Sequence, residues 1–399
     1  MKVLVINCGS SSVKFQLIET SDGSVQSDGI VERIGFKDAI FTYRIAEGEK
    51  VSQTQPVKNH TIAITHVLET LVGKNGVVRN LSEIGAVGHR FVHGGKRFIE
   101  SVIAGKLVLE EIRKILDLAP LHNPANLLGI EACISAMPAT PQVIVFDTAF
   151  HAHLKPEVYL YALPYEYYEK YGIRKYGFHG TSHFYVSSRV SELMGGFSGN
   201  LRIITCHLGN GCSIDAVHGG RAVDTSMGFT PLEGLMMGTR TGDIDTAAVL
   251  YIMKKESLSP EEADTLLNKK SGLLGVSGIS SDLREVIEAA NSGNERARIA
   301  LDMYCYRIKK YISAYVGVLG GLDALAFTAG VGEHSPLVRR KVCEGLECLG
   351  IEIDHSKNNT AMQGETEINK SGSPARIFVI PTNEEMVIAR EAERLSTKQ

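Results

Sequence analysis

Residues 5–12, Val-Ile-Asn-Cys-Gly-Ser-Ser-Ser, are matched 200 residues later by residues 205–212, Thr-Cys-His-Leu-Gly-Asn-Gly-Cys. In both segments an apolar run typical of a strand ends in a turn of small residues, and a second strand-like run follows. This repeat predicts two related α/β domains, each opening with a hairpin. The match is short and glycine hairpins are common, so coincidence is the alternative explanation at this point.

Apolar runs elsewhere favour the α/β class, because strand and helix patterns alternate along the whole chain. Val143–Phe146, Leu325–Phe327 and Ile377–Ile380 are continuous apolar runs, which are typical of strands buried on both faces. The region from Lys37 to Lys58 is polar and weakly patterned. We expect it to be irregular or peripheral.

The expected helices are marked by their ends. Proline follows Asn123 and Thr230, and a proline just inside a helix start predicts a helix at each place. Apolar residues at helical spacing over 301–315 predict a long helix that ends at the glycine pair 320–321. A last amphipathic helix is expected to start near Asn383.

Length and composition indicate a soluble protein of more than one domain. The chain has 399 residues, whereas a single core rarely grows beyond ~250–300 residues. Its 42 basic and 45 acidic side chains give a net charge of −3, which provides no positive surface for nucleic acid or an anionic membrane. No apolar run is long enough to span a membrane, and seven cysteines without a C-x-x-C pair argue against a disulfide framework or zinc ribbon. We expect a reduced, cytoplasmic protein.

Three turns of small residues follow predicted strands, at Gly9–Ser12, Gly209–Gly211 and Gly330–Glu333. Small residues let consecutive backbone N–H groups converge on an anion, and Lys14 lies just past the first turn. Three such turns in one chain favour a nucleotide, although each alone also fits an ordinary turn. The P-loop, Rossmann and protein-kinase motifs are absent from the sequence.

Two arginines stand in unusually glycine-rich segments: Arg90 in Gly-His-Arg-Phe-Val-His-Gly-Gly, and Arg240 in Met-Met-Gly-Thr-Arg-Thr-Gly-Asp. A guanidinium in such a place is better explained by an anionic ligand than by surface solvation, and it can stabilise a transferring phosphoryl group. His179 precedes a predicted helix, where its ring could donate to a phosphoryl oxygen. Its i, i+4 spacing with His183 leaves a metal as the competing idea, but no clear third ligand supports zinc.

Two carboxylates stand where ligands gather in open α/β sheets. Asp147 ends the buried run Val-Ile-Val-Phe-Asp, and a lone buried carboxylate is costly, so we expect it to face an arginine or a hydrated metal. Glu384 opens the last helix, where spacing alone indicates only a first-turn acid favoured by the helix dipole.

Long motifs occur in order across both halves of the sequence. They are Val-Leu-Val-Ile-Asn-Cys-Gly-Ser-Ser-Ser-Val-Lys-Phe (3–15), Gly-His-Arg-Phe-Val-His-Gly-Gly (88–95), Phe-Asp-Thr-Ala-Phe-His (146–151), Gly-Phe-His-Gly-Thr-Ser-His (177–183), His-Leu-Gly-Asn-Gly (207–211) and Phe-Thr-Pro-Leu-Glu-Gly-Leu-Met-Met-Gly-Thr-Arg (229–240). With these motifs, the sequence resembles the acetate kinase family over nearly its whole length, and the number and order of the motifs make the likeness specific.

The resemblance implies a duplicated actin-like (ribonuclease H-like) ATPase fold, with two α/β domains around a central nucleotide cleft. Residues 1–150 with 385–399 are expected to form the substrate and magnesium side, and residues 151–384 the nucleotide-binding and dimerisation side. The implied reaction is direct in-line transfer from ATP to acetate, giving ADP and acetyl phosphate. Mg²⁺ is the implied cofactor, with Mn²⁺ as a substitute, and the implied assembly is a homodimer.

The resemblance also implies roles for individual residues. Asn7 and Glu384 would belong to the magnesium site, which replaces the plain interpretation of Glu384 given above. Arg90 would bind the substrate carboxylate, and Arg240 with His179 would stabilise the transferring phosphoryl group. The implied nucleotide contacts are Lys14, His207, Leu208, Gly209, Asn210, Gly211, Asp282, Leu283, Arg284, Gly330, Val331, Gly332, Glu333 and His334. The implied apolar pocket for the substrate methyl group consists of Val92, Leu121, Phe178 and Pro231.

Asp147 matches a position that the family labels as an active-site residue. A carboxylate substrate is already ionised at neutral pH, so no general base is needed to create the nucleophile. Our hypothesis is that Asp147 orients Arg90 or a magnesium-bound water. Alignment and charge neutralisation would then supply most of the acceleration.

Three rival functions remain open from the sequence. A propionate kinase differs by one methylene, which an apolar pocket distinguishes by only ~1–3 kcal/mol. A sugar or glycerol kinase of the same superfamily would use an aspartate to deprotonate a hydroxyl and would need a more polar pocket. An actin-like filament protein or chaperone ATPase would hydrolyse ATP without a carboxylate acceptor.

Overall fold

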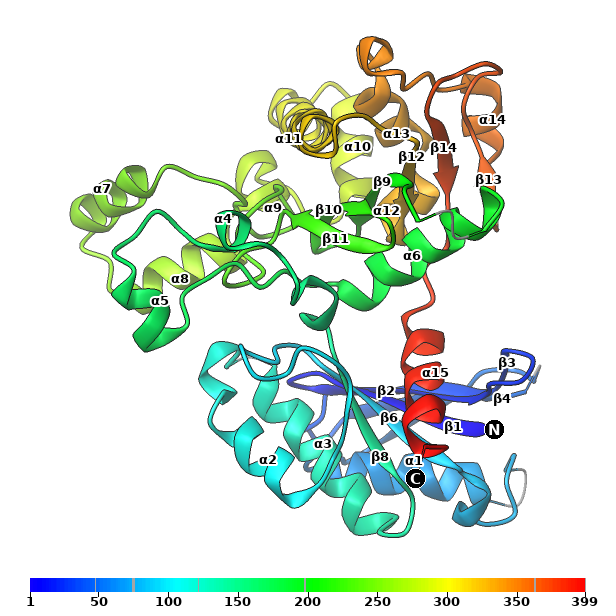
Figure 1. Ribbon diagram of the computed structural model, residues 1–399. Coiled ribbons are helices and arrows are strands. Elements are labelled where there is room, and N and C mark those ends of the chain that lie inside the picture. Colours follow the sequence, from blue (N-terminus) through cyan, green and yellow to red (C-terminus); the bar gives the residue numbers. More distant parts are fainter. Residues whose placement is uncertain (47, 74–75, 121, 197–198, 362–363, 399) are drawn as a thin grey trace. The chain divides into compact units, whose positions relative to one another are not determined.

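The computed structural model describes residues 1–46, 48–73, 76–120, 122–196, 199–361 and 364–398. The chain forms two compact units (Figure 1). Unit 1 consists of Met1–Ala152 and Asn383–Gln399, and unit 2 consists of His153–Thr382. Each unit is an α/β structure built on a single mixed sheet among the described residues.

The described residues of unit 1 form a sheet in the order β5-β4-β3-β2-β1-β6-β8-β7. Its strands are β1 (Lys2–Cys8), β2 (Ser12–Glu19), β3 (Ser24–Glu32), β4 (Ala39–Ile45), β5 (Val51–Gln55), β6 (Ala86–Phe91), β7 (Val102–Ile103) and β8 (Gln142–Phe146). The sheet of unit 2 has the order β11-β10-β9-β12-β14-β13. Its strands are β9 (Arg202–Leu208), β10 (Cys212–His218), β11 (Arg221–Thr225), β12 (Ala324–Thr328), β13 (Thr366–Glu367) and β14 (Arg376–Val379).

The two sheets repeat one topology, which confirms the duplication predicted from the sequence. In each, the first strand pairs antiparallel with a hairpin partner and parallel with the next long strand. The second and third parallel strands also correspond, β6 and β8 to β12 and β14. The hairpins keep the 200-residue offset: β1 spans 2–8 and β9 spans 202–208, while β2 and β10 begin at 12 and 212.

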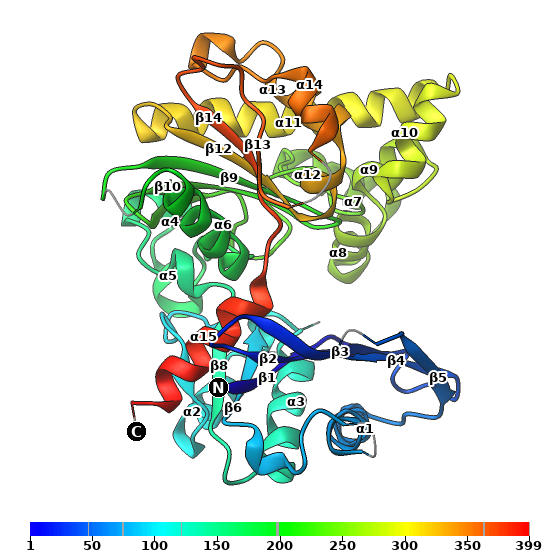
Figure 2. The same cartoon turned by 90° about the vertical axis from the view of Figure 1, so that its right-hand side faces the viewer.

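Helices cover both faces of each sheet (Figures 1 and 2). Unit 1 contains α1 (His60–Val72), α2 (Lys106–Arg113), α3 (Asn123–Ala136) and α15 (Glu384–Ser396). Unit 2 contains α4 (Pro156–Tyr159), α5 (Glu166–Tyr171), α6 (Gly180–Leu193), α7 (Thr246–Glu256), α8 (Pro260–Lys269), α9 (Gly272–Ser277), α10 (Leu283–Asn291), α11 (Glu295–Leu319), α12 (Ala329–His334), α13 (Pro336–Cys343) and α14 (His355–Thr360). Over the residues described, no helix combines the length and the apolar character that crossing a membrane requires.

Strand alternation produces two cores in unit 1, one on each face of the sheet. Val3 and Val5 of β1 pack in one core with Ile388 of α15. Leu4 and Ile6, which point to the other face, pack in the core that α1 and α3 cover. Gly88 of β6 lies under α15, because a Cβ built there would be 2.6 Å from Ile388 Cγ2. In unit 2, α11 packs on β9 and β10, and α6 packs on β9 and β12.

The chain crosses to the other unit after each half's last parallel strand. After β8 it passes into unit 2, where α4, α5 and then α6 form, and after β14 it returns to unit 1 as α15, red in Figure 1. His179 occupies the N-cap position of α6, and Asn383 caps α15 by accepting a hydrogen bond from the Met386 N–H at 2.9 Å. This exchange places His179 and Glu384 at helix starts in different units.

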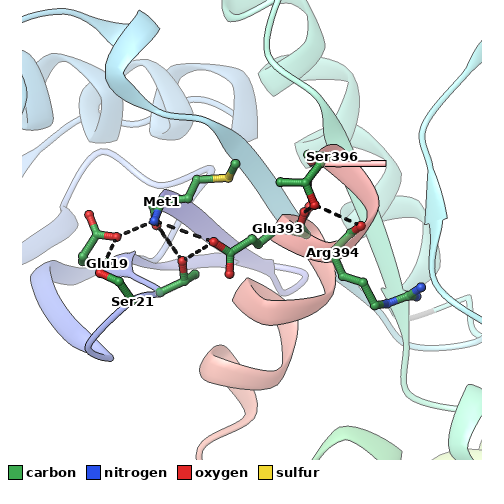
Figure 3. Close-up of polar contacts among 9 residues, drawn as sticks. Met1, Glu19, Ser21, Glu393, Arg394 and Ser396 are labelled. Carbon is green, nitrogen blue, oxygen red and sulfur yellow. Dashed lines mark hydrogen bonds and ion pairs between the residues drawn. The ribbon is translucent and has the colours of Figure 1, made fainter. Parts of the chain in front are cut away.

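The chain's amino terminus fastens α15 to the hairpin of unit 1 (Figure 3). The Met1 ammonium donates to the Glu19 carboxylate of β2 and lies 3.7 Å from Glu393 of α15. The Thr20 hydroxyl donates to the same Glu393 carboxylate at 2.8 Å. These contacts hold α15 against the start of β1 and the end of β2.

Two expectations about local structure were wrong, and a third was right only in part. Residues 37–58 are peripheral, as expected, but they contain the regular strands β4 and β5, which extend the sheet outward to its edge. Only alternate residues near the start of β4, Ala39 and Phe41, are buried, and β5 has no fully buried residue, so the apolar signal was weak. No helix begins at Pro231, because Gly234 adopts φ +104° and the Asp243 side chain accepts from its N–H. Residues 330–333 form part of the short helix α12 instead of an open turn.

Candidate active site

The site residues of unit 1 lie at the carboxyl ends of two parallel strands, β6 and β8, as ligand sites in open α/β sheets do. Arg90 Nη2 donates to Asp147 Oδ2 at 2.7 Å, and Arg90 Nε lies 3.1 and 3.2 Å from the two carboxylate oxygens. The Asp147 side chain is 1% exposed and that of Arg90 is 23% exposed. A buried carboxylate therefore faces an arginine, which is one of the two partners, arginine or hydrated metal, expected from its burial.

The charge of Arg90 is strongly supported by its surroundings. Burial acts against it, but the carboxylates of Asp147 and Glu384 outweigh burial and raise the pKa of the guanidinium. Glu384 also lies in unit 1, in the first turn of α15. Asp147 uses Nε and one N–H of Nη2, and within the described structure no residue hydrogen-bonds to Nη1. Arg90 is thus a fixed cation with N–H groups left for an anion.

Two further predicted residues of unit 1 lie on neighbouring strands of the same sheet, β1 and β2. Asn7 is half-buried near the end of β1 and lies opposite Lys14 of β2. Lys14 forms an ion pair with Glu385 of α15, and half of its side chain is exposed. Lys14 lies in unit 1, whereas the other predicted nucleotide contacts lie in unit 2.

The predicted apolar pocket draws on both units. Val92 of unit 1 is 6% exposed, and its backbone N–H donates to Asn126 Oδ1 at 3.1 Å. Phe178 of unit 2 is 2% exposed, and Pro231 is half-buried. Leu121 lies outside the described residues. The pocket as a whole therefore stays a prediction.

In unit 2, His179 and Arg240 face the same glycine. A Cβ built on Gly211 would lie 3.4 Å from Arg240 Nη1 and 3.6 Å from His179 Nε2. The His179 ring stacks on His207, with centroids 4.2 Å apart and planes 24° apart, and its Nδ1 is 2.8 Å from Ser213 Oγ. The turn after β9 thus presents a side-chain-free surface to a guanidinium and an imidazole.

Arg240 is electrostatically the opposite of Arg90. Burial lowers the pKa of its guanidinium. Its hydrogen bonds go to the Pro231 carbonyl at 3.4 Å and to Met237 Sδ at 3.7 Å, and no carboxylate of the described chain pairs with it. A partly buried cation without a counter-charge is costly. An anionic ligand would relieve that cost.

The predicted nucleotide segments of unit 2 meet around the ends of β9 and β12. A Cβ on Gly209 would lie 3.9 Å from the Ala329 Cβ, so the turn after β9 lies beside the start of α12. The Gly238 N–H donates to the Asn210 carbonyl at 3.0 Å, and a Cβ on Gly238 would lie 3.0 Å from the Ser281 carbonyl oxygen. The structure therefore brings three sequence-distant segments to one place: 207–211, the start of α10 and α12.

Within these segments the side chains differ in role. Asp282 caps α10 by accepting from the Arg284 N–H at 2.9 Å, and its carboxylate raises the pKa of the largely exposed Arg284 guanidinium. His207 and Leu208 end β9, and Leu283 begins α10 with its side chain buried. In α12, Gly330 and His334 are exposed, Val331 and Glu333 are half-buried and Gly332 is buried. Glu333 accepts from the Thr382 N–H at 3.3 Å.

Sequence reasoning missed two residues that organise this site. Arg339 is wholly buried and donates through Nη1 to the carbonyls of Gly332 and Glu333, each at 2.8 Å, which fixes the end of α12. Burial lowers its pKa to about 10. Ser213 bonds both His179 and His183. The i, i+4 spacing of these histidines brings both rings to one hydroxyl, that of Ser213.

Comparison with known proteins identifies the class. The model of the acetokinase family matches residues 2–390. A protein of Dictyoglomus thermophilum named acetate kinase is 56% identical over the full length of both chains. The crystal structure of Porphyromonas gingivalis acetate kinase is 47% identical, with a TM-score of 0.95 and 99% of each chain covered. A propionate kinase from Francisella tularensis has 42% identity and a TM-score of 0.92, also over 99% of each chain.

A two-domain α/β kinase of the duplicated actin-like type is therefore the class that fold and site define. Within that class, the chain belongs to the acetokinase family. The fold class expected from the sequence is confirmed.

Proposed function

We propose that this protein is an acetate kinase, a phosphotransferase with a carboxyl group as acceptor. An acetate oxygen attacks the γ-phosphorus of ATP, the bond from that phosphorus to the bridging oxygen breaks, and acetyl phosphate and ADP result. The reaction is reversible. The observation that carries the proposal is the contrast between two arginines: Arg90 is held by Asp147 with N–H groups to spare, and Arg240 is partly buried without a carboxylate.

Unit 1 would bind the acceptor. Arg90 would donate to the acetate carboxylate, in a geometry that guanidinium and carboxylate share. Asp147 would act through Arg90, because its carboxylate fixes the plane and the charge of the guanidinium. Acetate is ionised at neutral pH, so no side chain needs to remove a proton from it. Asp147 is thus assigned as an orienting group and not as a base.

Unit 2 would bind the nucleotide and stabilise the negative charge of the transferring phosphoryl group. Arg240 and His179 would contact the transferring phosphoryl group, which carries negative charge on its equatorial oxygens. Segments 207–211, 282–284 and 330–334 would hold the nucleotide, with Lys14 reaching it from unit 1. Val92, Leu121, Phe178 and Pro231 would enclose the methyl group.

A magnesium ion would be held by few protein oxygens. Asn7 and Glu384 supply an amide and a carboxylate oxygen, the donor types that Mg²⁺ prefers, and Mn²⁺ would suit them too. No cage of three or more histidine, cysteine or acidic side chains occurs in the part of the chain that is described. This agrees with a cation held mainly by phosphates and water. When bound, it would neutralise phosphate charge.

A homodimer formed through unit 2 is the assembly we propose. Helix α7 has no buried residue, and Leu250 and Tyr251 on it are 66% and 63% exposed. An 11-residue helix with such side chains in water is better explained by a second copy that covers it. We also propose a cytoplasmic location, in line with seven cysteines that form no disulfide among the described residues.

The proposed activity is tested by trapping acyl phosphate as its hydroxamate. Purified protein with Mg-ATP is offered acetate, propionate, butyrate or glycerol, with hydroxylamine present. We expect the highest kcat/KM with acetate and no phosphoryl transfer to glycerol, since the proposed pocket binds a carboxylate and a methyl group.

Other results would change the assignment in defined ways. A preference for propionate would keep the chemistry but contradict the proposed substrate, in line with the small discrimination of one methylene. ATP hydrolysis without hydroxamate from any acid would contradict a carboxyl acceptor altogether.

Replacement of Asp147 tests its orienting role. Asp147→Asn should lower kcat/KM for acetate by about 100-fold, because Arg90 loses the carboxylate that fixes its position and charge, and a misplaced substrate-binding group can cost about 10²-fold in rate. Steady-state kinetics provide the measurement. Asp38→Asn is the matched control, since its ion pair with Arg33 is largely exposed and should leave the rate within about twofold. A near-normal rate for Asp147→Asn would contradict the orienting role of Asp147.

Charge introduced on α7 tests the dimer. The double variant Leu250→Asp, Tyr251→Asp should elute and scatter light as the 43.4 kDa chain, whereas the native protein should show twice that mass. Leu107→Asp, at a 76% exposed position on α2 of unit 1, is the control and should remain dimeric. A native monomer, or a dimer that survives the α7 double substitution, would contradict this interface.

A further inference from the structure

A buried chain of hydrogen bonds runs behind His179. Ser213 lies on β10 with no exposed surface, and its Oγ is 2.8 Å from His179 Nδ1 and 2.7 Å from His183 Nε2. The two histidines stand one helical turn apart at the start of α6. His183 Nε2 also lies 3.4 Å from Asp215 Oδ1. One serine hydroxyl therefore joins two imidazoles, and a carboxylate stands at the far end.

The carboxylate sets the direction of this chain. The side chains of His183 and Asp215 are both 0% exposed. A bare ring nitrogen facing a carboxylate in a dry site would bring two negative partial charges together, so His183 Nε2 carries a proton. This holds whether the ring is neutral or charged. Thr205 Oγ1, 2.7 Å from His183 Nδ1, suits both states, because a hydroxyl can donate or accept.

The proton on His183 determines the tautomer of His179. His183 Nε2–H donates to Ser213 Oγ, which leaves the single hydroxyl proton of Ser213 to donate to His179 Nδ1. A neutral imidazole that accepts at Nδ1 carries its proton on Nε2. His179 Nε2 is the atom that faces Gly211 beside Arg240 Nη1. At its His179 end, this chain of hydrogen bonds thus presents an N–H donor next to the Arg240 guanidinium.

The backbone holds the ring in this place. His179 has φ 57°, in the left-handed region that histidine adopts at a cost. Stacking on His207 restrains the ring plane. With position and tautomer both fixed, the N–H is aimed before any ligand arrives, which is the condition under which a hydrogen-bond donor stabilises a charged transition state best.

We infer that Ser213 is a positioning residue, which with His183 and Asp215 fixes His179 in the Nε2–H tautomer that donates to the transferring phosphoryl group. The inference deepens the proposed function and rests on it for the identity of the acceptor. The tautomer itself does not depend on the substrate. It can therefore be measured separately from activity.

The direct test is the ¹⁵N spectrum of the histidine side chains in the full-length protein. The chain has 13 histidines, and the His179→Gln variant identifies the signals of residue 179 by their loss. We expect His179 to show a protonated Nε2 and an unprotonated Nδ1. An unprotonated Nε2 of His179 in the native protein would overturn the inference, and it would leave the proposed reaction standing.

Kinetics of Ser213→Ala supply the second readout. Removal of a preorganised donor typically costs about 10²–10³-fold, and an imidazole free to change tautomer should lose part of this, so we expect kcat to fall about 10- to 100-fold. KM values for ATP and acetate should stay within about threefold. The His179 signals should shift to a mixture of tautomers, and Ser213→Thr, which keeps the hydroxyl, should restore the Nε2–H form.

A merely structural serine would behave differently. Ser191→Ala is the matched control, because Ser191 is a buried serine of α6 whose hydroxyl donates to the Ser187 carbonyl at 2.9 Å, and its kcat should stay native. Native kcat in Ser213→Ala, or an unchanged His179 tautomer there, would contradict the positioning role. Absence of hydroxamate from the native protein would instead contradict the proposed function.

Discussion

Parallel pairing in two copies of one sheet is the constraint on which the rest of the structure depends. β1, β6 and β8 run side by side in unit 1, and β9, β12 and β14 do so in unit 2. Their carboxyl ends share an edge within each sheet, so Arg90 and Asp147 meet, and so do the turn after His207 and the helix after Thr328. The carboxyl ends of these strands therefore determine where the candidate site residues lie.

Duplication of the fold did not duplicate the electrostatics. Arg90 has a buried carboxylate partner that raises its pKa, whereas burial lowers the pKa of Arg240 and no described carboxylate offsets it. A compensated cation suits a singly charged acceptor that must bind and leave. An uncompensated cation interacts most favourably with the charge that builds up during phosphoryl transfer. In the proposed reaction, this asymmetry would give the two arginines separate tasks, with Arg90 on the acceptor and Arg240 on the transferring phosphoryl group.

Parts of the fold and of the candidate site could be predicted from the sequence wherever a single physical rule determined the structure. The repeat predicted the paired sheets, and the cost of a lone buried carboxylate predicted that Asp147 faces an arginine or a hydrated metal, of which the structure shows the arginine, Arg90. The strands within 37–58 were missed because only alternate residues at one end face a core. Ser213 was missed because a serine inside a strand gives no local signal. Its role depends on a helix that begins more than thirty residues earlier in the chain.

We propose that Arg240 lacks a counter-charge because the transferring phosphoryl group supplies it. Steady-state kinetics of Arg240→Ala beside Arg90→Ala test this role most directly. We expect Arg240→Ala to lower kcat by about 10²–10³-fold with KM for acetate changed only a few-fold, and Arg90→Ala mainly to raise KM for acetate. If Arg240→Ala kept its kcat and lost only acetate affinity, the proposed role of Arg240 would be contradicted.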